Sequence, residues 1–294
     1  MAAPPRTLYA EEMKRFNFAF FRFFMITLFM ATLSAWREWA AAAPMTVMID
    51  PGHGGVDVGA SQPGIKESDL VLHVALLLRD LLNKDENFSA QMTRAEDVRV
   101  SLPERVNRAE MAKADLFISL HANSSTDPRA RGMEVYLLSH LPADEDALLI
   151  AAIENEKQSV GGAAQVGASG TSADATGVYP EESAPHETLS KRDDVSSILS
   201  DLKRDGMSRS SLKLSRIVAH KWPLDDHRSS KPVRQAPFYV INKSRSPSIL
   251  IELGFLSHQK DREALKQRAT QEKVARAIYS SLAEFRHLTS LTRP

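Results

Sequence analysis

The chain of 294 residues contains no cysteine. This absence excludes disulfide bonds, iron–sulfur clusters, cysteine-type zinc fingers and thiol nucleophiles, so any metal must be bound by His, Asp or Glu. The chain also lacks an excess of either charge, because 37 Lys and Arg balance 37 Asp and Glu. A neutral chain has no electrostatic footprint for a polyanion, and we therefore expect no binding to nucleic acid. With 43% hydrophobic residues, the composition is that of a globular protein.

The apolar run near the N-terminus is too short to span a bilayer. Residues 23–36 carry no charge and follow a basic segment, and this length of 14 residues fits a signal-peptide core, whereas a membrane span needs about 20. Small residues follow at positions 40–43, as at a cleavage site. We predict that residues 1–43 are a signal peptide and that the protein is exported. Arg37 and Glu38 leave an uncleaved membrane anchor open, and a buried core helix is a further alternative.

The remaining residues, 44–294, alternate short apolar runs with amphipathic ones. The short runs are rich in Val, Ile, Leu and Phe and mostly lack polar alternation, which predicts strands that are buried on both faces, at residues 45–50, 88–93, 116–120, 133–139, 238–242 and 248–252. Helical spacing of apolar residues lies between them, around 70–81 and 274–285. The pattern predicts an α/β fold: an open, twisted, mostly parallel sheet of about six strands with helices on both faces.

An insertion interrupts this alternation at residues 159–206. Its first part is rich in Gly, Ser and Ala and is expected to be a flexible loop. Its second part is expected to be a short amphipathic helix that contains Val195, Ile198, Leu199 and Leu202. Loops of this length inside a domain are usually functional or disordered.

Ionisable residues follow three of the predicted strands. His53 lies in a Gly-rich turn after the first strand, His121 follows the third and Glu252 ends the last. Because ligands bind in the crevice at the carboxyl ends of strands in open α/β sheets, we expect these residues to share one site. Glu67 opens the first helix, and the loop that precedes it can carry it to the same crevice.

Two imidazoles and one carboxylate, with an open fourth position, are the ligand set of a hydrolytic zinc ion. The second carboxylate is then free to take a proton from water and to pass it to a leaving amine. Taken singly, each residue has a simpler explanation: a turn histidine, a helix-start carboxylate or a salt-bridge partner. Together they favour a metal site, because such groups after apolar strands are costly to bury without a metal or a partner.

The order of the motifs resembles the zinc-dependent N-acetylmuramoyl-L-alanine amidases, including the cell-division amidases of Gram-negative bacteria. The resemblance runs from about residue 46 to residue 285. It rests on IDPGHGG at 49–55, Glu67 before an apolar helix, Thr93-Arg94, Leu102 with Arg105, ADLFISLHAN at 114–123, Gly132 with EVY at 134–136, and IELGFLS at 251–257. The chain differs from the family at His258, where an Asn is common, and this position is close enough in sequence to Glu252 to alter the rim of the site.

The resemblance implies that His53, Glu67 and His121 bind Zn²⁺ and that Glu252 is catalytic. It implies hydrolysis of the amide between N-acetylmuramic acid and L-alanine in peptidoglycan, in the periplasm, during wall remodelling and daughter-cell separation. We expect a monomer with no separate N-terminal targeting domain. The rival hypotheses are a zinc peptidase that cuts within the stem peptide and a non-catalytic wall-binding protein, and the intact set of four residues argues against the second.

The insertion is similar to the regulatory segment of the division amidases, in which a helix covers the zinc cleft until a periplasmic activator of the degenerate LytM-domain type displaces it. The resemblance therefore implies autoinhibition by residues of about 187–204. An acid near the metal would block its open position, and the candidates are Glu187, Asp193, Asp194 and Asp201. The alternative is a disordered surface loop with an incidental helix.

Overall fold

The computed structural model describes residues 43–138, 145–160, 191–224 and 228–290, together with Met25 and Thr27. Nearly all of the expected signal peptide lies outside these residues, as do residues 161–190 of the insertion. Residues Met45–Pro294 form one compact unit. In the described part of the chain, no helix is both long and apolar enough to cross a membrane.

A six-stranded sheet runs through this unit in the order β4-β1-β5-β8-β6-β7. Its strands are β1 (Met45–Pro51), β4 (Phe88–Met92), β5 (Leu116–Asn123), β6 (Met133–Leu137), β7 (Arg228–Gln235) and β8 (Ser248–Phe255). Neighbouring strands are parallel except β6 and β8, which are antiparallel. A separate two-stranded ribbon consists of β2 (Ser61–Gln62) and β3 (Ile65–Lys66). The predicted mostly parallel α/β sheet is thus confirmed.

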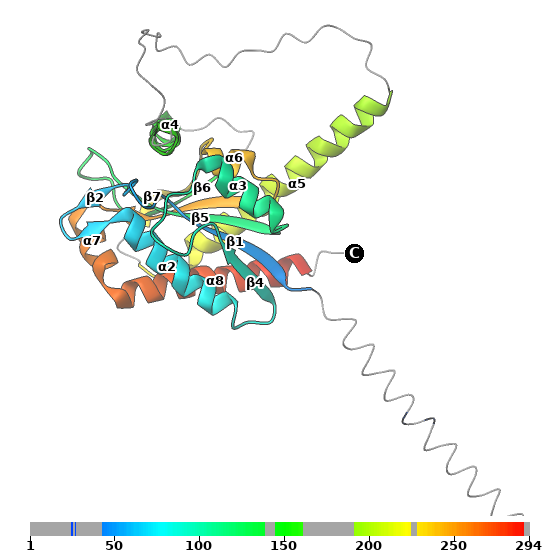
Figure 1. Ribbon diagram of the computed structural model, residues 1–294, viewed down its shortest axis with the longest axis horizontal. Coiled ribbons are helices and arrows are strands. Elements are labelled where there is room, and N and C mark those ends of the chain that lie inside the picture. The colour runs from blue at the N-terminus through cyan, green and yellow to red at the C-terminus, as the bar shows by residue number, and fades with distance from the viewer. Residues whose placement is uncertain are drawn as a thin grey trace, which may run out of the picture. The chain divides into compact units, whose positions relative to one another are not determined.

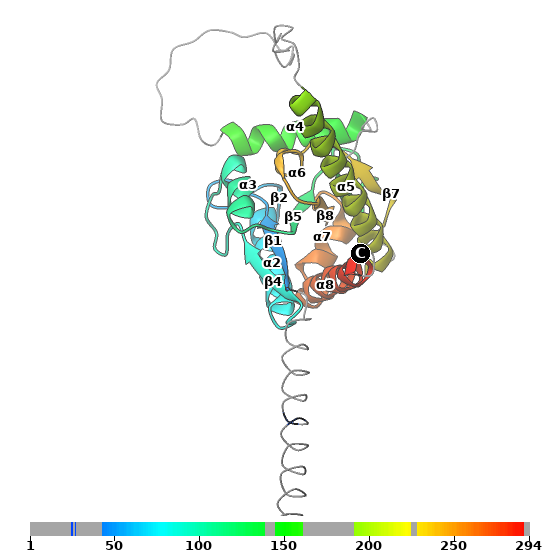
Figure 2. The same ribbon diagram turned by 90° about the vertical axis from the view of Figure 1, so that its right-hand side faces the viewer.

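Helices cover both faces of the sheet (Figures 1 and 2). They are α2 (Glu67–Leu82), α3 (Leu102–Met111), α4 (Glu145–Val160), α5 (Lys191–Lys221), α6 (Tyr239–Lys243), α7 (Gln259–Lys266) and α8 (Arg268–Ser290). One core lies between the sheet and α2, α5 and α8, and it contains Ile118 and Ile251. The other lies between the sheet and α3, α4 and α6, and it contains Phe117 and Leu250. Because strand side chains alternate between faces, His121 and Glu252 belong to the second face.

Two parts of the predicted sheet were wrong. Residues 238–242 form a helical turn rather than a strand, with the amide of Asn242 donating to the carbonyl of Phe238 at 2.9 Å. A short apolar run does not distinguish a strand from a buried helical segment. The sixth strand is β7, whose polar sequence carries Pro232 and charged residues. These residues are typical of an edge strand, which apolar patterning does not detect.

Candidate metal centre and active site

Three of the predicted site residues come together at the carboxyl ends of β1 and β5. His53 follows β1, His121 lies near the end of β5 and Glu67 begins α2, and one ligand atom from each lies within 4.8 Å of the others. All three residues are buried. This arrangement arises because β1 and β5 are adjacent and parallel, so that their carboxyl ends lie side by side.

Two arginines hold the loop that carries His53. Arg94 donates to the carbonyl oxygens of Pro51 and Gly52 at 3.0 and 2.7 Å, and Arg105 donates to those of Pro51 and His53 at 2.7 and 2.8 Å. His53 itself has φ of 56°, a conformation that is uncommon for residues other than glycine. The buried guanidinium groups therefore stabilise a strained turn that presents the imidazole to the cluster.

Asp50 anchors Arg105 below this loop. Their ion pair of 2.7 Å is buried, and Asp50 also accepts hydrogen bonds from Thr93 at 2.6 Å and Ser119 at 2.8 Å. Burial alone would raise the pKa of Asp50, but the charge of Arg105 and these hydrogen bonds lower it. The motif residues Thr93, Arg94 and Arg105 thus support the histidine loop.

Two glycines allow the cluster to close. A Cβ atom on Gly52 would lie 2.3 Å from the ring of His121, and one on Gly59 would lie 2.4 Å from Oε2 of Glu67. Gly59 also has φ of 65°, which few other residues adopt. Glycine at these two positions leaves the space that the imidazole and the carboxylate occupy.

Glu67 is fixed by both histidines and by backbone amides. Its Oε1 lies 2.9 Å from Nδ1 of His121 and 3.1 Å from Nε2 of His53, and its two oxygens accept from the amides of Ala122 and Ala60 at 3.0 and 2.8 Å. Burial raises the pKa of Glu67, but the charge of His53 and the contacts with both histidines outweigh burial and lower it. The carboxylate is therefore held in its ionised form, which is the form that binds a metal.

The second nitrogen of His53 is held by a carboxylate. Nδ1 of His53 lies 2.9 Å from both oxygens of Asp57. Although burial lowers the pKa of His53, the charge of Glu67 and the carboxylates of Asp57 and Glu154 raise it to about 12. A carboxylate behind a histidine is the usual support of a metal ligand, because it fixes the orientation of the ring.

The cluster fits a metal ion. Nε2 of His53 is buried and makes no well-aligned hydrogen bond among the described residues, although it points toward Glu67. A buried ring nitrogen of this kind needs a partner, and two imidazoles with one carboxylate are a donor set that zinc accepts.

Glu252 lies on the strand next to the cluster. It is paired in register with His121 of β5 on one side and with Glu134 of β6 on the other. Burial raises the pKa of Glu252 well above its ordinary value, and the charges of Glu67, Glu154 and Glu134 raise it further. Its Oε2 is buried and has no hydrogen-bond partner among the described residues. The group is therefore placed to exchange a proton with a molecule bound at the cluster.

Glu154 of α4 also lies at the cluster, although no motif in the sequence indicates it. Its Oε2 lies 3.2 Å from Nε2 of His53 and 4.0 Å from Nδ1 of His121. Burial raises its pKa, but the contact with His53 and the histidine charges lower it. The signal for this residue in the sequence is weak, because α4 has no strong apolar face and precedes the expected insertion.

Of the four acids predicted to block the metal, the structure describes the side chain of Asp201 alone. Asp201 is exposed on α5, Asp193 and Asp194 lie in α5 with side chains outside the described residues, and Glu187 lies outside them altogether. The amphipathic helix expected in the insertion is part of α5, where Ile198, Leu199 and Leu202 are exposed.

His258 caps a helix. Its Nδ1 accepts a hydrogen bond of 3.5 Å from the amide of Asp261 at the start of α7 and lies 3.3 Å from the carboxylate of that residue.

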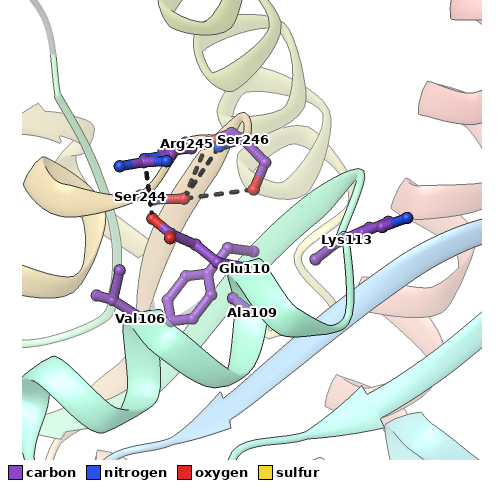
Figure 3. A pocket seen from close by; sticks show the side chains of 9 residues that line it. Val106, Ala109, Glu110, Lys113, Ser244, Arg245 and Ser246 are labelled. Atoms are coloured by element: carbon purple, nitrogen blue, oxygen red, sulfur yellow. Dashed lines mark hydrogen bonds and ion pairs between the residues drawn. The ribbon is translucent and has the colours of Figure 1, made fainter.

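A hollow lies at the amino-terminal edge of β5 and β8, away from the histidine cluster. It has a volume of about 330 Å³ and lies between the end of α3 and residues 244–246 (Figure 3). Glu110 and Arg245 form an ion pair of 3.0 Å at its rim. The histidine cluster lies at the other edge of the sheet and is separate from this hollow.

Comparison with known proteins identifies the family. Residues 47–284 match the family described as N-acetylmuramoyl-L-alanine amidase. The chain belongs to this amidase family. Its residues His53, Glu67, His121 and Glu252 thus lie in an amidase domain that covers most of the chain.

Curated relatives agree with the family assignment. The chain is 32% identical over 263 residues to a probable N-acetylmuramoyl-L-alanine amidase, AmiB, of Haemophilus influenzae, which covers 88% of this chain and 56% of the relative. It is 30% identical over 244 residues to the amidase AmiC of Escherichia coli, covering 82% of this chain and 53% of that one. The chain spans about half the length of these relatives.

Solved structures show the same fold. The catalytic domain of the amidase CwlV of Paenibacillus polymyxa superposes with a TM-score of 0.54 at 22% identity, over 83% of this chain and 98% of that one. The amidase AmiC2 of Nostoc punctiforme has the same TM-score at 25% identity, over 83% and 97% of the two chains.

Proposed function

We propose that this protein is a zinc-dependent N-acetylmuramoyl-L-alanine amidase that hydrolyses the amide between N-acetylmuramic acid and L-alanine in peptidoglycan. The observation that carries the proposal is the buried cluster of His53, Glu67 and His121 beside Glu252, in a chain of the amidase family. Export to the periplasm and a role in daughter-cell separation extend the proposal, on the basis of the expected signal peptide and of the resemblance to the division amidases.

His53, Glu67 and His121 would hold the zinc ion. When bound, zinc supplies a Lewis acid that polarises the scissile carbonyl and makes water more acidic. Asp57 keeps the imidazole of His53 in position, and the amides of Ala60 and Ala122 keep the carboxylate of Glu67 in position. These supports preorganise the ligands before the metal arrives.

Glu252 would move the proton. A buried carboxylate with a raised pKa is suited to take a proton from the attacking water and to give it to the leaving amine of L-alanine. Hydrolysis then breaks one C–N bond, adds the hydroxyl of water to the lactyl carbonyl carbon and leaves the proton on the amine. Its position between His121 and Glu134 in the sheet fixes the carboxylate near the cluster.

Digestion of purified peptidoglycan with the zinc-loaded chain tests the proposal. We expect intact stem peptides with a free L-alanine amine, together with peptide-free glycan strands, identified by mass spectrometry. Fragments of the stem peptide would instead identify a peptidase. Binding to the wall without any released product would identify a wall-binding protein.

Helix α4 would act as the inhibitory element. Glu154 places a carboxylate against His53, where it competes with substrate for the open position of the metal. Packing of α4 is limited: Ala147 and Ala151 are buried, Leu148, Leu149 and Ile153 are exposed, and Asn155 accepts from the amide of Tyr239 at 2.8 Å. A helix with this small a buried face can be displaced at modest cost.

A periplasmic activator of the degenerate LytM-domain type would release this helix. The three exposed apolar residues on α5, Ile198, Leu199 and Leu202, are 58–61% exposed and offer a surface for such a partner. Because residues 161–190 join α4 to α5, a partner that binds α5 can shift the population in which α4 leaves the cluster.

A further inference from the structure

A pocket of about 640 Å³ lies beside the candidate active site. Its lining includes Ser124 and Ser125 just after β5, Glu134 of β6, Arg234 of β7, and Leu149 and Ile150 of α4. Arg129 and Arg131 also line it, so that three guanidinium groups face the two lining carboxylates of Asp127 and Glu134 and leave an excess of one positive charge. A cationic pocket next to a hydrolytic site favours an anionic part of the substrate.

A row of side chains connects Glu252 to this pocket across the sheet. Glu134 is paired with Glu252 in the β6–β8 register, and Arg234 is paired with Tyr136 in the β6–β7 register. Arg234 donates from Nη1 to Oε1 of Glu134 at 3.2 Å, and its guanidinium carbon lies 5.7 Å from the centre of the Tyr136 ring. These contacts fix the orientation of a guanidinium group two strands from Glu252.

The same helix covers both the pocket and the cluster. Leu149 and Ile150 line the pocket, and Glu154, one helical turn beyond Ile150, contacts His53. Displacement of α4 would therefore open the metal position and the pocket together. This coupling makes the pocket part of the surface that substrate meets.

We propose that this pocket binds the free carboxylate of the stem-peptide residue that follows L-alanine, with Arg131 and Arg234 as its guanidinium donors. This inference rests on the proposed amidase function. Arg129 is 89% exposed and is paired with Asp127 at 3.0 Å, which places it at the rim. Arg234 is only 11% exposed, and a guanidinium group with so little contact with water interacts more strongly with a carboxylate.

Chemistry and distance determine which part of the substrate reaches the pocket. The lactyl carboxyl group of the sugar is consumed in the scissile amide, so the free carboxylates lie on the peptide side. A chain advances by about 3.5 Å per residue, which places a carboxylate on the second residue about 7 Å from the scissile nitrogen. Strands are spaced by about 4.8 Å, so β7 lies about 10 Å from β8, within reach of that group and an arginine side chain.

Two synthetic muramoyl peptides test the inference. They differ only at the second stem residue, which bears a free carboxylate in one and a primary amide in the other. The zinc-loaded chain should hydrolyse the carboxylate form with a kcat/KM roughly 10-fold higher, as expected for charge-assisted hydrogen bonds. The fraction of molecules in which α4 covers the cluster lowers both kcat/KM values by the same factor. The ratio of the two values therefore depends only on binding of the carboxylate in the pocket.

The Arg234→Gln and Arg131→Gln variants should each move this ratio toward one, mainly through the carboxylate substrate. Arg276→Gln, at an exposed position on α8, is the matched control and should keep the wild-type ratio. If the Arg234→Gln variant does not fold or does not bind zinc, the Arg131→Gln variant tests the inference, because the side chain of Arg131 is exposed.

Equal rates for both substrates in the wild type, or an unchanged ratio in the folded variants, would overturn this inference and leave the amidase function standing. Hydrolysis of neither substrate by the zinc-loaded Glu154→Ala variant, in which the contact of α4 with the cluster is removed, would overturn the proposed function, and the inference with it.

Discussion

Oε2 of Glu154 lies 3.2 Å from Nε2 of His53, although α4 and the histidine loop are about a hundred positions apart in the chain. The carboxylate contact and the exposed apolar residues of α4 together indicate that this helix covers the cluster and can be displaced from it. We predict that Glu154→Ala raises basal hydrolysis of peptidoglycan by about 10-fold, because the closed state loses its contact with the cluster. Release of stem peptide without added partner measures the change.

Glu156→Ala is the control for this block, since Glu156 is exposed on the same helix. Asp201→Asn examines one of the acids that the sequence suggested, and we expect it to leave the basal rate unchanged. Equal rates for Glu154→Ala and the wild type, in folded protein with full zinc content, would argue against inhibition by α4.

The metal ligands can be tested by zinc content. His53→Ala and His121→Ala should each abolish stoichiometric binding, because the two protein ligands that remain hold the ion poorly. His73→Ala, at an exposed position on α2, should retain one zinc per chain. Atomic absorption of dialysed protein measures the metal, and stoichiometric zinc in either cluster variant would remove that histidine from the ligand set.

A variant of Glu252 can distinguish proton transfer from metal binding, because loss of proton transfer lowers the rate of hydrolysis without loss of zinc. Glu252→Gln should keep zinc and the fold while hydrolysis falls by roughly 10²–10⁴-fold, the usual range for a general acid–base group. Glu263→Gln, which is exposed on α7, should keep the wild-type rate. Loss of zinc from Glu252→Gln would place this carboxylate among the metal ligands, and full activity would assign the proton transfer to another group.

Gly59 and Gly64 form a matched pair for the space around Glu67. Both have positive φ, of 65° and 78°, but a Cβ atom would lie 2.4 Å from Glu67 at position 59 and no closer than 3.7 Å to any atom at position 64. Both alanine variants should lose about 1 kcal/mol of stability from backbone strain. Gly59→Ala alone should also weaken zinc binding by about 10-fold or more, measured by competition with a chelator. Equal zinc affinities would show that the cluster tolerates the added methyl group.

The buried pair of Asp50 and Arg105 should contribute to stability above about pH 4. Asp50→Asn should lower the free energy of unfolding by roughly 3–5 kcal/mol, because it leaves a buried guanidinium group without its counter-charge. The pKa of Asp50 is lowered in the folded state, so its contribution is complete above the unfolded value of about 3.9 and is lost as the pH falls through the folded value.

Urea denaturation at several pH values measures this contribution, and the difference between Asp50→Asn and the wild type should shrink below about pH 4. Asp80→Asn, which breaks an exposed pair with Arg79, should cost less than about 1 kcal/mol. A pH-independent difference would show that packing, rather than charge, is what Asp50 contributes.

Sequence patterns alone were enough to predict that His53, Glu67 and His121 lie together. His53, His121 and Glu252 follow or end apolar runs, which indicates a shared edge because the carboxyl ends of parallel strands lie together, and the motif at Glu67 indicated a third residue of the same cluster. Five of the six predicted strands are present, since runs buried on both faces are apolar along their whole length. The polar edge strand β7 and the helical turn α6 were missed for lack of such a pattern.

Contacts between distant segments became visible in the folded chain and not in the sequence. The sequence places Arg94 and Arg105 in family motifs without indicating what they contact, because their role depends on the carbonyl groups that the folded loop turns toward them. Glu154 lies on a helix without a strong apolar face, so no periodicity indicates what it contacts. Local patterns report which face of an element is buried, whereas the partner of a single polar side chain depends on how elements far apart in the chain pack together.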